Sequence, residues 1–182
     1  ITAWINLNST SGFQCIFCKD QSGDSASQFR FSIGENGTGK LGYGDSSHSL
    51  GGNSTLSTST WYHAVITRSS GAGYTFYLNG IFDGNTAPGS PPNTNSRSAY
   101  IGARESNLGG LTSYFNGKID EVRFYHRSLS ADEVSQLYRL TSPTGVDTGL
   151  KGYWSFNGKD ISGTSAYDRS GAGNTGTLTN GP

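Results

Sequence analysis

The acidic and histidine side chains are the residues of this sequence that could catalyse a reaction, and they are scattered along the chain. Glycoside hydrolysis needs two carboxyl groups that act together, and on a strand such groups share a face at spacings of two or four residues. No Glu-x-Asp-x-x-Glu run occurs, and Asp120 and Glu121 are neighbours that point to opposite faces of a strand. The sequence therefore disfavours glycoside hydrolysis and predicts a protein that is not an enzyme.

The three histidines give no catalytic or metal-binding pattern. His48, His63 and His126 are far apart, and none has a second His at metal-ligand spacing. A Gly-x-Ser-x-Gly nucleophile motif is absent as well. We interpret each His as a strand or loop residue.

Cys15 and Cys18 lie in an apolar stretch that is typical of a strand. At i and i+3 of a regular strand their side chains face opposite sides about 10 Å apart, which is too far for a disulfide. A zinc or redox site would need a second Cys pair or clustered His, and neither occurs. We expect two buried free thiols.

Composition restricts the class of protein. The 182 residues suit one domain, and 13 Lys+Arg balance 13 Asp+Glu, so nucleic acid is an unexpected partner. No run approaches the roughly 20 apolar residues of a membrane helix, so we expect no membrane insertion. The chain opens at Ile1 without a signal peptide, which we interpret as an excised or processed end.

Short apolar or alternating runs separated by Gly, Asn and Ser predict an all-β sandwich of two antiparallel sheets. Asn79-Gly80 predicts a type I′ hairpin turn. Expected strands span 1–7, 13–19, 28–33, 40–43, 61–68, 74–78, 99–103 and 114–125. Trp4, Trp61 and Trp154 fall in strand patterns and are expected in the core.

One short helix is predicted over 129–140. Ser130 and Glu133 form a capping box, and Val134, Leu137 and Tyr138 form one apolar stripe. Residues 141–148 carry Pro and Gly without periodicity and are predicted to be a linker. Residues 149–182 are expected to form further strands.

Three segments together resemble the laminin-G-like jelly-roll family of the concanavalin A-like lectin and glucanase superfamily. They are WYHAVITR over 61–68 with YLNG over 77–80, FNGKIDEVRFY over 115–125 with the helix that follows, and GYWSFN over 152–157 with DRSG over 168–171. The resemblance implies a concanavalin A-like sandwich. It also places the family's opening strand at the C-terminus of this chain.

Three arrangements are compatible with that displaced strand. Residues 149–182 could complete the sandwich body over 1–140, as in a circular permutant, or could open the next repeat of a tandem array. They could also complete a neighbouring molecule and form strand-exchanged polymers. We favour completion of the same sandwich, because a sheet without this strand would expose an unpaired edge.

The resemblance also implies a structural calcium ion between the opening strand and the closing strand. Carried onto this sequence, its ligands would be Asp120 and Asn157, with Asp160 or Asp168. The alternative is that Asp120 only accepts hydrogen bonds in a turn.

Sugar binding in such folds uses an aromatic ring beside polar groups on loops. The candidate residues are Tyr43, His48, Arg104 and Tyr114. The leading hypothesis is a secreted or cell-surface recognition and adhesion module for a glycan or a cell-surface protein. The second is a structural repeat or filament subunit that binds copies of itself, and the third is a glycan-active enzyme.

Overall fold

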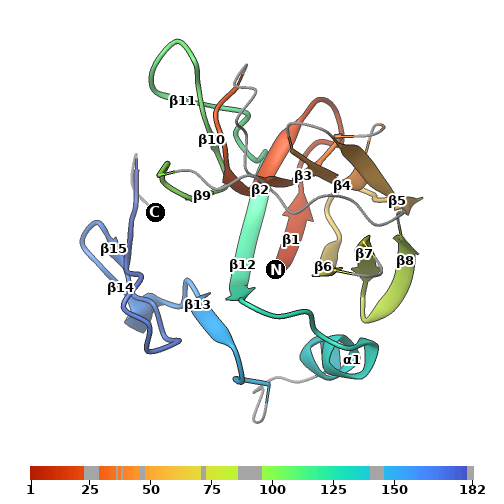
Figure 1. Ribbon diagram of the computed structural model, residues 1–182. Helices are drawn as coiled ribbons and strands as arrows, with labels where there is room; N and C mark the ends of the chain where they lie inside the picture. Colours follow the sequence, from red (N-terminus) through yellow and green to blue (C-terminus); the bar gives the residue numbers. More distant parts are fainter. Residues whose placement is uncertain are drawn as a thin grey trace.

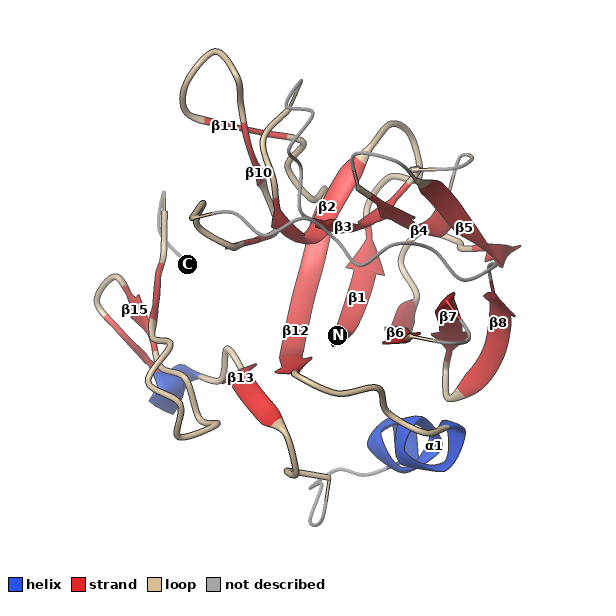
Figure 2. Ribbon diagram, viewed as in Figure 1, coloured by secondary structure: helices blue, strands red, loops and turns tan. Residues whose placement is uncertain are grey.

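The computed structural model confirms the expected β-sandwich (Figure 1). It describes residues 1–22, 29–35, 37, 39–45, 48–70, 73–85, 96–139 and 146–179. Two antiparallel sheets face each other, and a single α-helix of the described chain lies outside them (Figure 2).

The first sheet has six strands in the order β13-β12-β1-β6-β7-β8. Their bounds are β13 Leu150–Trp154, β12 Gly117–Tyr125, β1 Thr2–Leu7, β6 Trp61–Ser69, β7 Gly73–Leu78 and β8 Ile81–Asn85. The second sheet has five strands in the order β5-β4-β3-β2-β9. Their bounds are β5 Ser49–Thr55, β4 Lys40–Gly44, β3 Phe29–Ile33, β2 Gln14–Lys19 and β9 Tyr100–Ile101.

Smaller elements decorate the sandwich. β10 Arg104–Glu105 pairs with β11 Leu111–Thr112. The 3-10 turn η1 spans Gly158–Asp160, and it leads into a three-stranded sheet of β14 Ile161–Ser162, β15 Ser165–Ala166 and β16 Gly176–Thr177.

The core lies between the two large sheets and follows from strand alternation. Ala3, Ile5 and Leu7 of β1 are fully buried and point to the same face. From the second sheet, Phe31 and Ile33 of β3 are equally buried in the same cluster. The inner faces of both sheets therefore form one apolar layer.

The predicted hairpin turn is confirmed. Asn79 and Gly80 have φ angles of 53° and 77°, the positive values that a type I′ turn requires. Asn79 Oδ1 also accepts a hydrogen bond of 2.9 Å from the backbone N–H of His63, which ties the turn to β6.

The predicted helix is present as α1, Ala131–Arg139, which begins two residues later than expected, while residue 140 lies outside the described residues. The capping box is confirmed, since the Ser130 N–H donates to Glu133 Oε2 at 2.8 Å and the Glu133 N–H donates to Ser130 Oγ at 3.2 Å. Val134 and Leu137 pack with Val65 on the outer face of the first sheet.

Strand β5 was not expected, because its Gly51-Gly52 pair is typical of a loop. The structure gives a reason for Gly52. A Cβ atom at this position would lie 2.2 Å from Asp83 Oδ2, so only glycine lets β5 approach the buried Asp83 side chain.

The C-terminal segment returns to the first sheet. β13 pairs antiparallel with β12, with Val122 opposite Trp154 and Phe124 opposite Gly152. Within the predicted linker, residues 141–145 lie outside the described residues, while Val146 is buried against the α1 cluster. The division into a body, a linker and completing strands stays a prediction.

The expectation that Cys15 and Cys18 are free thiols is wrong, because they form a disulfide with a Cα–Cα distance of 6.1 Å. β2 has a bulge at Ile16, so the register partners of the two cysteines are Ser32 and Arg30, only two residues apart on β3. The extra residue therefore returns both side chains to the same face of the strand.

We expect the double variant Cys15→Ala/Cys18→Ala to be less stable than the native chain by about 2 kcal/mol, because the disulfide closes a short loop. Chemical unfolding of both proteins measures this difference. A loss above about 4 kcal/mol would show that the disulfide does more than restrict the unfolded chain.

The expectation that all three Trp residues lie in the core fails at Trp61, which is 43% exposed, and at Trp4, which is half-buried on the outer face of the first sheet. Alternation puts Trp61 on the outer face of the first sheet with His63 and Val65, which are covered by Tyr138 and the helix cluster. Trp61 is the first residue of β6, beyond that cover. Trp154 packs against the core, and Trp4 stacks on Tyr138 beneath the helix.

Candidate functional site

An aromatic-lined cavity of the described chain lies where the sandwich opens between β9 and β13. It has a volume of about 740 Å³ and is bounded by β2, β9, β12, β13 and the C-terminal segment 174–179. Figure 1 shows this C-terminal segment in blue, beside β13 at the edge of the first sheet. Its aromatic lining residues are Phe17, Phe29, Tyr100, Tyr114, Phe124, Trp154 and Phe156.

The inner wall of this pocket is a cluster of stacked rings from both sheets. Phe17 stacks on Phe124 with ring centroids 5.6 Å apart and on Phe29 at 5.8 Å, and Trp154 follows at 6.4 Å from Phe17. These rings point inward by strand alternation. Because β9 has only two residues, the second sheet ends early, and these rings form a wall of the cavity.

Backbone and side-chain hydrogen bonds hold the C-terminal segment against β13. Trp154 Nε1 donates to the carbonyl of Asn174 at 2.9 Å, and Asn174 Nδ2 donates to the carbonyl of Lys151 at 2.7 Å. The Asn174 N–H donates to Asp168 Oδ2 at 2.8 Å. These contacts position Thr175, Thr177 and Thr179 as polar lining of the pocket.

The charged groups of the pocket lining are all cationic. Lys19 and Lys151 line it, and among the described residues no Asp or Glu does. Lys19 Nζ also donates a hydrogen bond to the backbone carbonyl of Arg97. The arrangement offers ring faces for apolar C–H surface, hydroxyl and amide groups, and two ammonium groups for hydrogen bonding.

A smaller cavity of about 210 Å³ adjoins the first and shares Ile101, Gly102 and Phe156 with it. Its further lining comes from Phe115, Gly117 and Ile119 near the start of β12. The open edge of the sandwich is therefore a groove longer than the main pocket.

The four sequence-predicted binding residues do not meet at one place. Tyr114 is 56% exposed and lines the main pocket. Tyr43 is buried, its ring stacks on Tyr74, and its hydroxyl donates to Asp45 at 2.8 Å. The pKa of the Tyr43 hydroxyl is raised, mainly because the group is buried.

The other two predicted binding residues contact carboxylates elsewhere. His48 Nδ1 lies 2.9 Å from the carboxylate of Asp45, the residue that also accepts from Tyr43. Arg104 forms an ion pair of 2.8 Å with the fully buried Asp20, and its guanidinium lies over the ring of Phe13. Only Tyr114 of the four lines the pocket.

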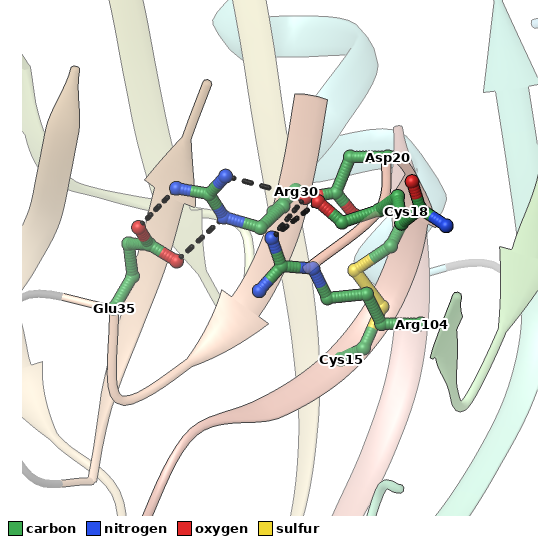
Figure 3. Close-up of a disulfide and its surroundings, with 7 residues drawn as sticks. Cys15, Cys18, Asp20, Arg30, Glu35 and Arg104 are labelled. Atoms are coloured by element: carbon green, nitrogen blue, oxygen red, sulfur yellow. Dashed lines mark hydrogen bonds and ion pairs between the residues drawn. A yellow bond between two sulfur atoms is a disulfide. The ribbon is translucent and has the colours of Figure 1, made fainter. Parts of the chain in front are cut away.

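Figure 3 shows the cluster around Asp20 beside the disulfide. Arg30 donates to Asp20 at 3.2 Å and to Glu35 Oε1 at 2.6 Å, so two arginines share the Asp20 carboxylate. Burial, the largest influence, raises the pKa of Asp20, although Arg104 and Arg30 oppose the rise. The cluster joins β3 to its neighbouring loops and lies outside the pocket lining.

The residues that the resemblance implies as calcium ligands hold the C-terminal turns instead. Asp160 accepts from the Ser155 hydroxyl and from Arg169 at 2.6 Å, and these two hydrogen bonds lower its pKa. Asp168 accepts from the backbone N–H groups of Tyr153 at 2.9 Å and Ser170 at 2.8 Å.

The other two implied calcium ligands, Asp120 and Asn157, do not complete a set of ligands with Asp160 and Asp168. Asp120 Oδ1 accepts from the Glu121 N–H at 2.9 Å, and burial raises the pKa of Asp120. Asn157 is exposed and precedes η1 without a side-chain cap. Within the part of the chain that the structure describes, no group of three or more His, Cys, Asp or Glu could hold a metal ion. The residues present do not fit the implied site, and calcium stays a sequence-based prediction.

Sequence reasoning missed most of the pocket because Phe17, Phe29, Phe124 and Trp154 carry the same signal as core residues. One feature of the sequence indicated an incomplete edge of the second sheet, namely that the apolar run before Gly102 is short. No helix of the described chain has the length and hydropathy needed to span a bilayer.

Two antiparallel sheets, a helix on the outer face and an aromatic groove at an open edge define a jelly-roll β-sandwich. The Laminin_G_3 family, of the concanavalin A-like lectin/glucanases superfamily, matches residues 1–135, and the chain belongs to this family. The resemblance seen in the sequence is thereby confirmed.

Solved structures show the same fold. A candidate carbohydrate-binding protein from Bacteroides ovatus ATCC 8483 aligns with a TM-score of 0.77 and 21% identity over 97% of this chain. The chain spans 52% of the length of that protein. No protein of curated function matches the sequence.

Two further structures align over the larger part of the chain. Domain 4 of AbnA, a GH43 extracellular arabinanase from Geobacillus stearothermophilus solved with arabinotriose, has a TM-score of 0.57 and 20% identity, covering 76% of this chain and 65% of its own. The CBM40 of the Ruminococcus gnavus IT-sialidase, bound to α2,3-sialyllactose, has a TM-score of 0.56 and 16% identity, covering 75% and 81%. At these identities the likeness concerns the fold.

Proposed function

We propose that this chain is a non-catalytic carbohydrate-binding module that holds a glycan in the pocket between β9 and β13. The single observation that carries the proposal is the aromatic-walled cavity of about 740 Å³ with polar groups at its edge. Sugars present apolar C–H faces that stack on rings, and hydroxyls that need hydrogen-bond partners. The pocket supplies both.

The names of the structural neighbours support the same class of ligand. The first is a candidate carbohydrate-binding protein, and two others were solved with arabinotriose and with sialyllactose. Because these relatives belong to proteins of diverse activity and identity is low, the ligand of this chain has to be argued from its own pocket.

The absence of carboxylates among the described lining residues supports a binding role over a hydrolytic one. Both common routes of glycoside hydrolysis need a pair of carboxyl groups beside the scissile bond. Acids close in sequence to lining residues are engaged elsewhere: Asp20 pairs with Arg104, Asp160 with Arg169, and Asp168 accepts from backbone N–H groups. We therefore propose a module that recognises its glycan without cleaving it.

The disulfide supports an extracellular or cell-surface location. Structural disulfides persist in oxidising compartments and are rare where thiol reductants prevail. The Cys15–Cys18 bridge is fully buried in the second sheet, as a structural disulfide would be.

Tyr114→Ala tests the proposed site, because this ring is exposed at the pocket and its removal leaves the core intact. We expect a glycan identified on an array to bind the variant about fivefold more weakly in calorimetry, since ring stacking contributes roughly 1 kcal/mol.

Tyr167→Ala is the matched control, because Tyr167 is 46% exposed and does not line the pocket. Unchanged affinity in Tyr114→Ala, or an equal loss in both variants, would contradict the proposed site. Light scattering on the same samples detects the competing role as a self-assembling subunit, which predicts oligomers that grow with concentration while no glycan binds.

A further inference from the structure

The charges around the pocket are unbalanced although those of the whole chain are balanced. The chain carries 13 basic and 13 acidic side chains. Lys19 and Lys151 nevertheless line the pocket without an acidic lining residue in the described chain. The asymmetry is therefore local to the cavity and does not follow from overall charge.

The acids that surround this region already have cationic or backbone partners. Glu105 accepts from Arg97 at 3.1 Å, and Asp160 accepts from Arg169 at 2.6 Å. Asp168 accepts from three backbone N–H groups, those of Tyr153, Ser170 and Asn174. Within the described residues these carboxylates pair with arginines and backbone groups and not with Lys19 or Lys151, so the two ammonium groups keep donor capacity for a ligand.

The two lysines come from different sheets. Lys19 is the last residue of β2 and Lys151 is the second residue of β13, so the aromatic wall is flanked by one ammonium group from each sheet. Lys19 Nζ is positioned by its bond to the Arg97 carbonyl. Lys151 is exposed, and its own carbonyl accepts from Asn174.

A concave apolar wall strengthens the attraction between these cations and an anion. Charges in a cleft with low-dielectric walls interact more strongly than on an open surface. A neutral sugar would gain ordinary hydrogen bonds there, whereas a carboxylate or a sulfate would gain charge-assisted bonds of roughly twice the strength.

We propose that the glycan held in this pocket is acidic, with a carboxylate or sulfate group that binds Lys19 and Lys151 while a sugar ring stacks on the aromatic wall. This inference rests on the proposed function and names its class of ligand. A uronic acid and a sulfated sugar share the required anionic chemistry.

The experiment compares acidic oligosaccharides with neutral twins that differ only in charge. The probes are oligogalacturonate and its methyl ester, together with a sulfated galactan oligosaccharide and its desulfated form. Calorimetry at low salt is expected to show that one acidic probe binds at least tenfold more tightly than its twin, and the pair that shows this advantage separates carboxylate from sulfate. The advantage should shrink in about 0.5 M salt.

We expect the single variants Lys151→Gln and Lys19→Gln each to lose most of the tighter binding of the acidic probe. The variant Lys19→Arg keeps the positive charge and should keep the tighter binding. Lys159→Gln is the control, since Lys159 is exposed and does not line the pocket. Thermal unfolding of each variant checks that the fold is unchanged.

Each other outcome overturns a defined statement. Equal binding of an acidic probe and its neutral twin overturns the acidic ligand and leaves the carbohydrate-binding function standing. An equal loss in Lys159→Gln shows unspecific charge attraction and also overturns the inference. If no probe binds and a broad array of neutral and acidic glycans is silent as well, the proposed function itself fails.

Discussion

Arg30→Met is expected to lower the free energy of unfolding by about 3–5 kcal/mol, the usual cost of breaking a buried ion pair from one side. The Arg30 side chain is 12% exposed and its partners Asp20 and Glu35 are 0% and 8% exposed. Methionine is close to arginine in length but leaves Glu35 without its bidentate partner and Asp20 with Arg104 alone. Urea unfolding followed by tryptophan fluorescence measures the difference.

Arg97→Met is the matched control. The Arg97–Glu105 ion pair spans 3.1 Å, but both side chains are 29% exposed, so this variant should lose less than about 1 kcal/mol. If Arg30→Met does not cost clearly more than the control, the argument from burial is wrong. If Arg30→Met fails to fold, Arg30→Lys, which keeps the charge and loses the two-pronged bond to Glu35, should give an intermediate loss.

The second large effect concerns pH and His63. This side chain is 1% exposed, and its ring packs against both Trp4 at 5.4 Å and Tyr138 at 6.2 Å. Burial, with a contribution from Arg123, lowers the pKa of His63 from 6.5 to about 3. Neither ring nitrogen has a hydrogen-bond partner within the described residues, so nothing there stabilises the protonated form.

The sign of the pH effect follows from this lowered pKa. Below pH 6.5 the unfolded chain binds a proton at His63, while the folded chain does so only near pH 3. Neutral His63 therefore costs the folded state nothing above pH 6.5. As the pH falls toward 3, proton binding by the unfolded chain lowers the free energy of unfolding, with a limiting slope of about 1.4 kcal/mol per pH unit. Between pH 6 and pH 4 this amounts to about 2–3 kcal/mol.

His63→Phe should remove this part of the pH dependence, because phenylalanine keeps a ring against Trp4 and Tyr138 and has no site that binds a proton. Unfolding free energies of both proteins between pH 4 and pH 8 provide the measurement, and carboxylates that titrate in both cancel in the difference. His126→Phe is the control, since His126 is exposed. Parallel curves for the native chain and His63→Phe would show that His63 is not held neutral by burial.

Features that depend on near neighbours in the chain were predictable. Asn79-Gly80 favours positive φ at both positions whatever surrounds it, and the Ser130 and Glu133 capping box closes within one helical turn. The alternation of β1 determines which of its side chains face the core. Local conformational preference and side-chain period are properties of the sequence alone.

Features that depend on a second segment were not predictable. The bulge at Ile16 exists only in the pairing of β2 with β3, and it brings Cys15 and Cys18 together. The partners of Asp160 and Asp168 are likewise Arg169 and backbone groups that folding brings within reach. Contacts of this kind cannot be read from the spacing of residues in the sequence, because they form only when the chain folds.

The sequence by itself determined the all-β class, the order of most strands, the hairpin turn and the helix, because each depends on periodicity and local backbone preference. Only the tertiary structure decided which aromatic residues are accessible. Phe17 and Phe124 have the pattern of core residues, and they line a pocket because β9 ends after two residues and leaves the space between the sheets open. Burial depends on what covers a side chain, and that cover comes from segments distant in sequence.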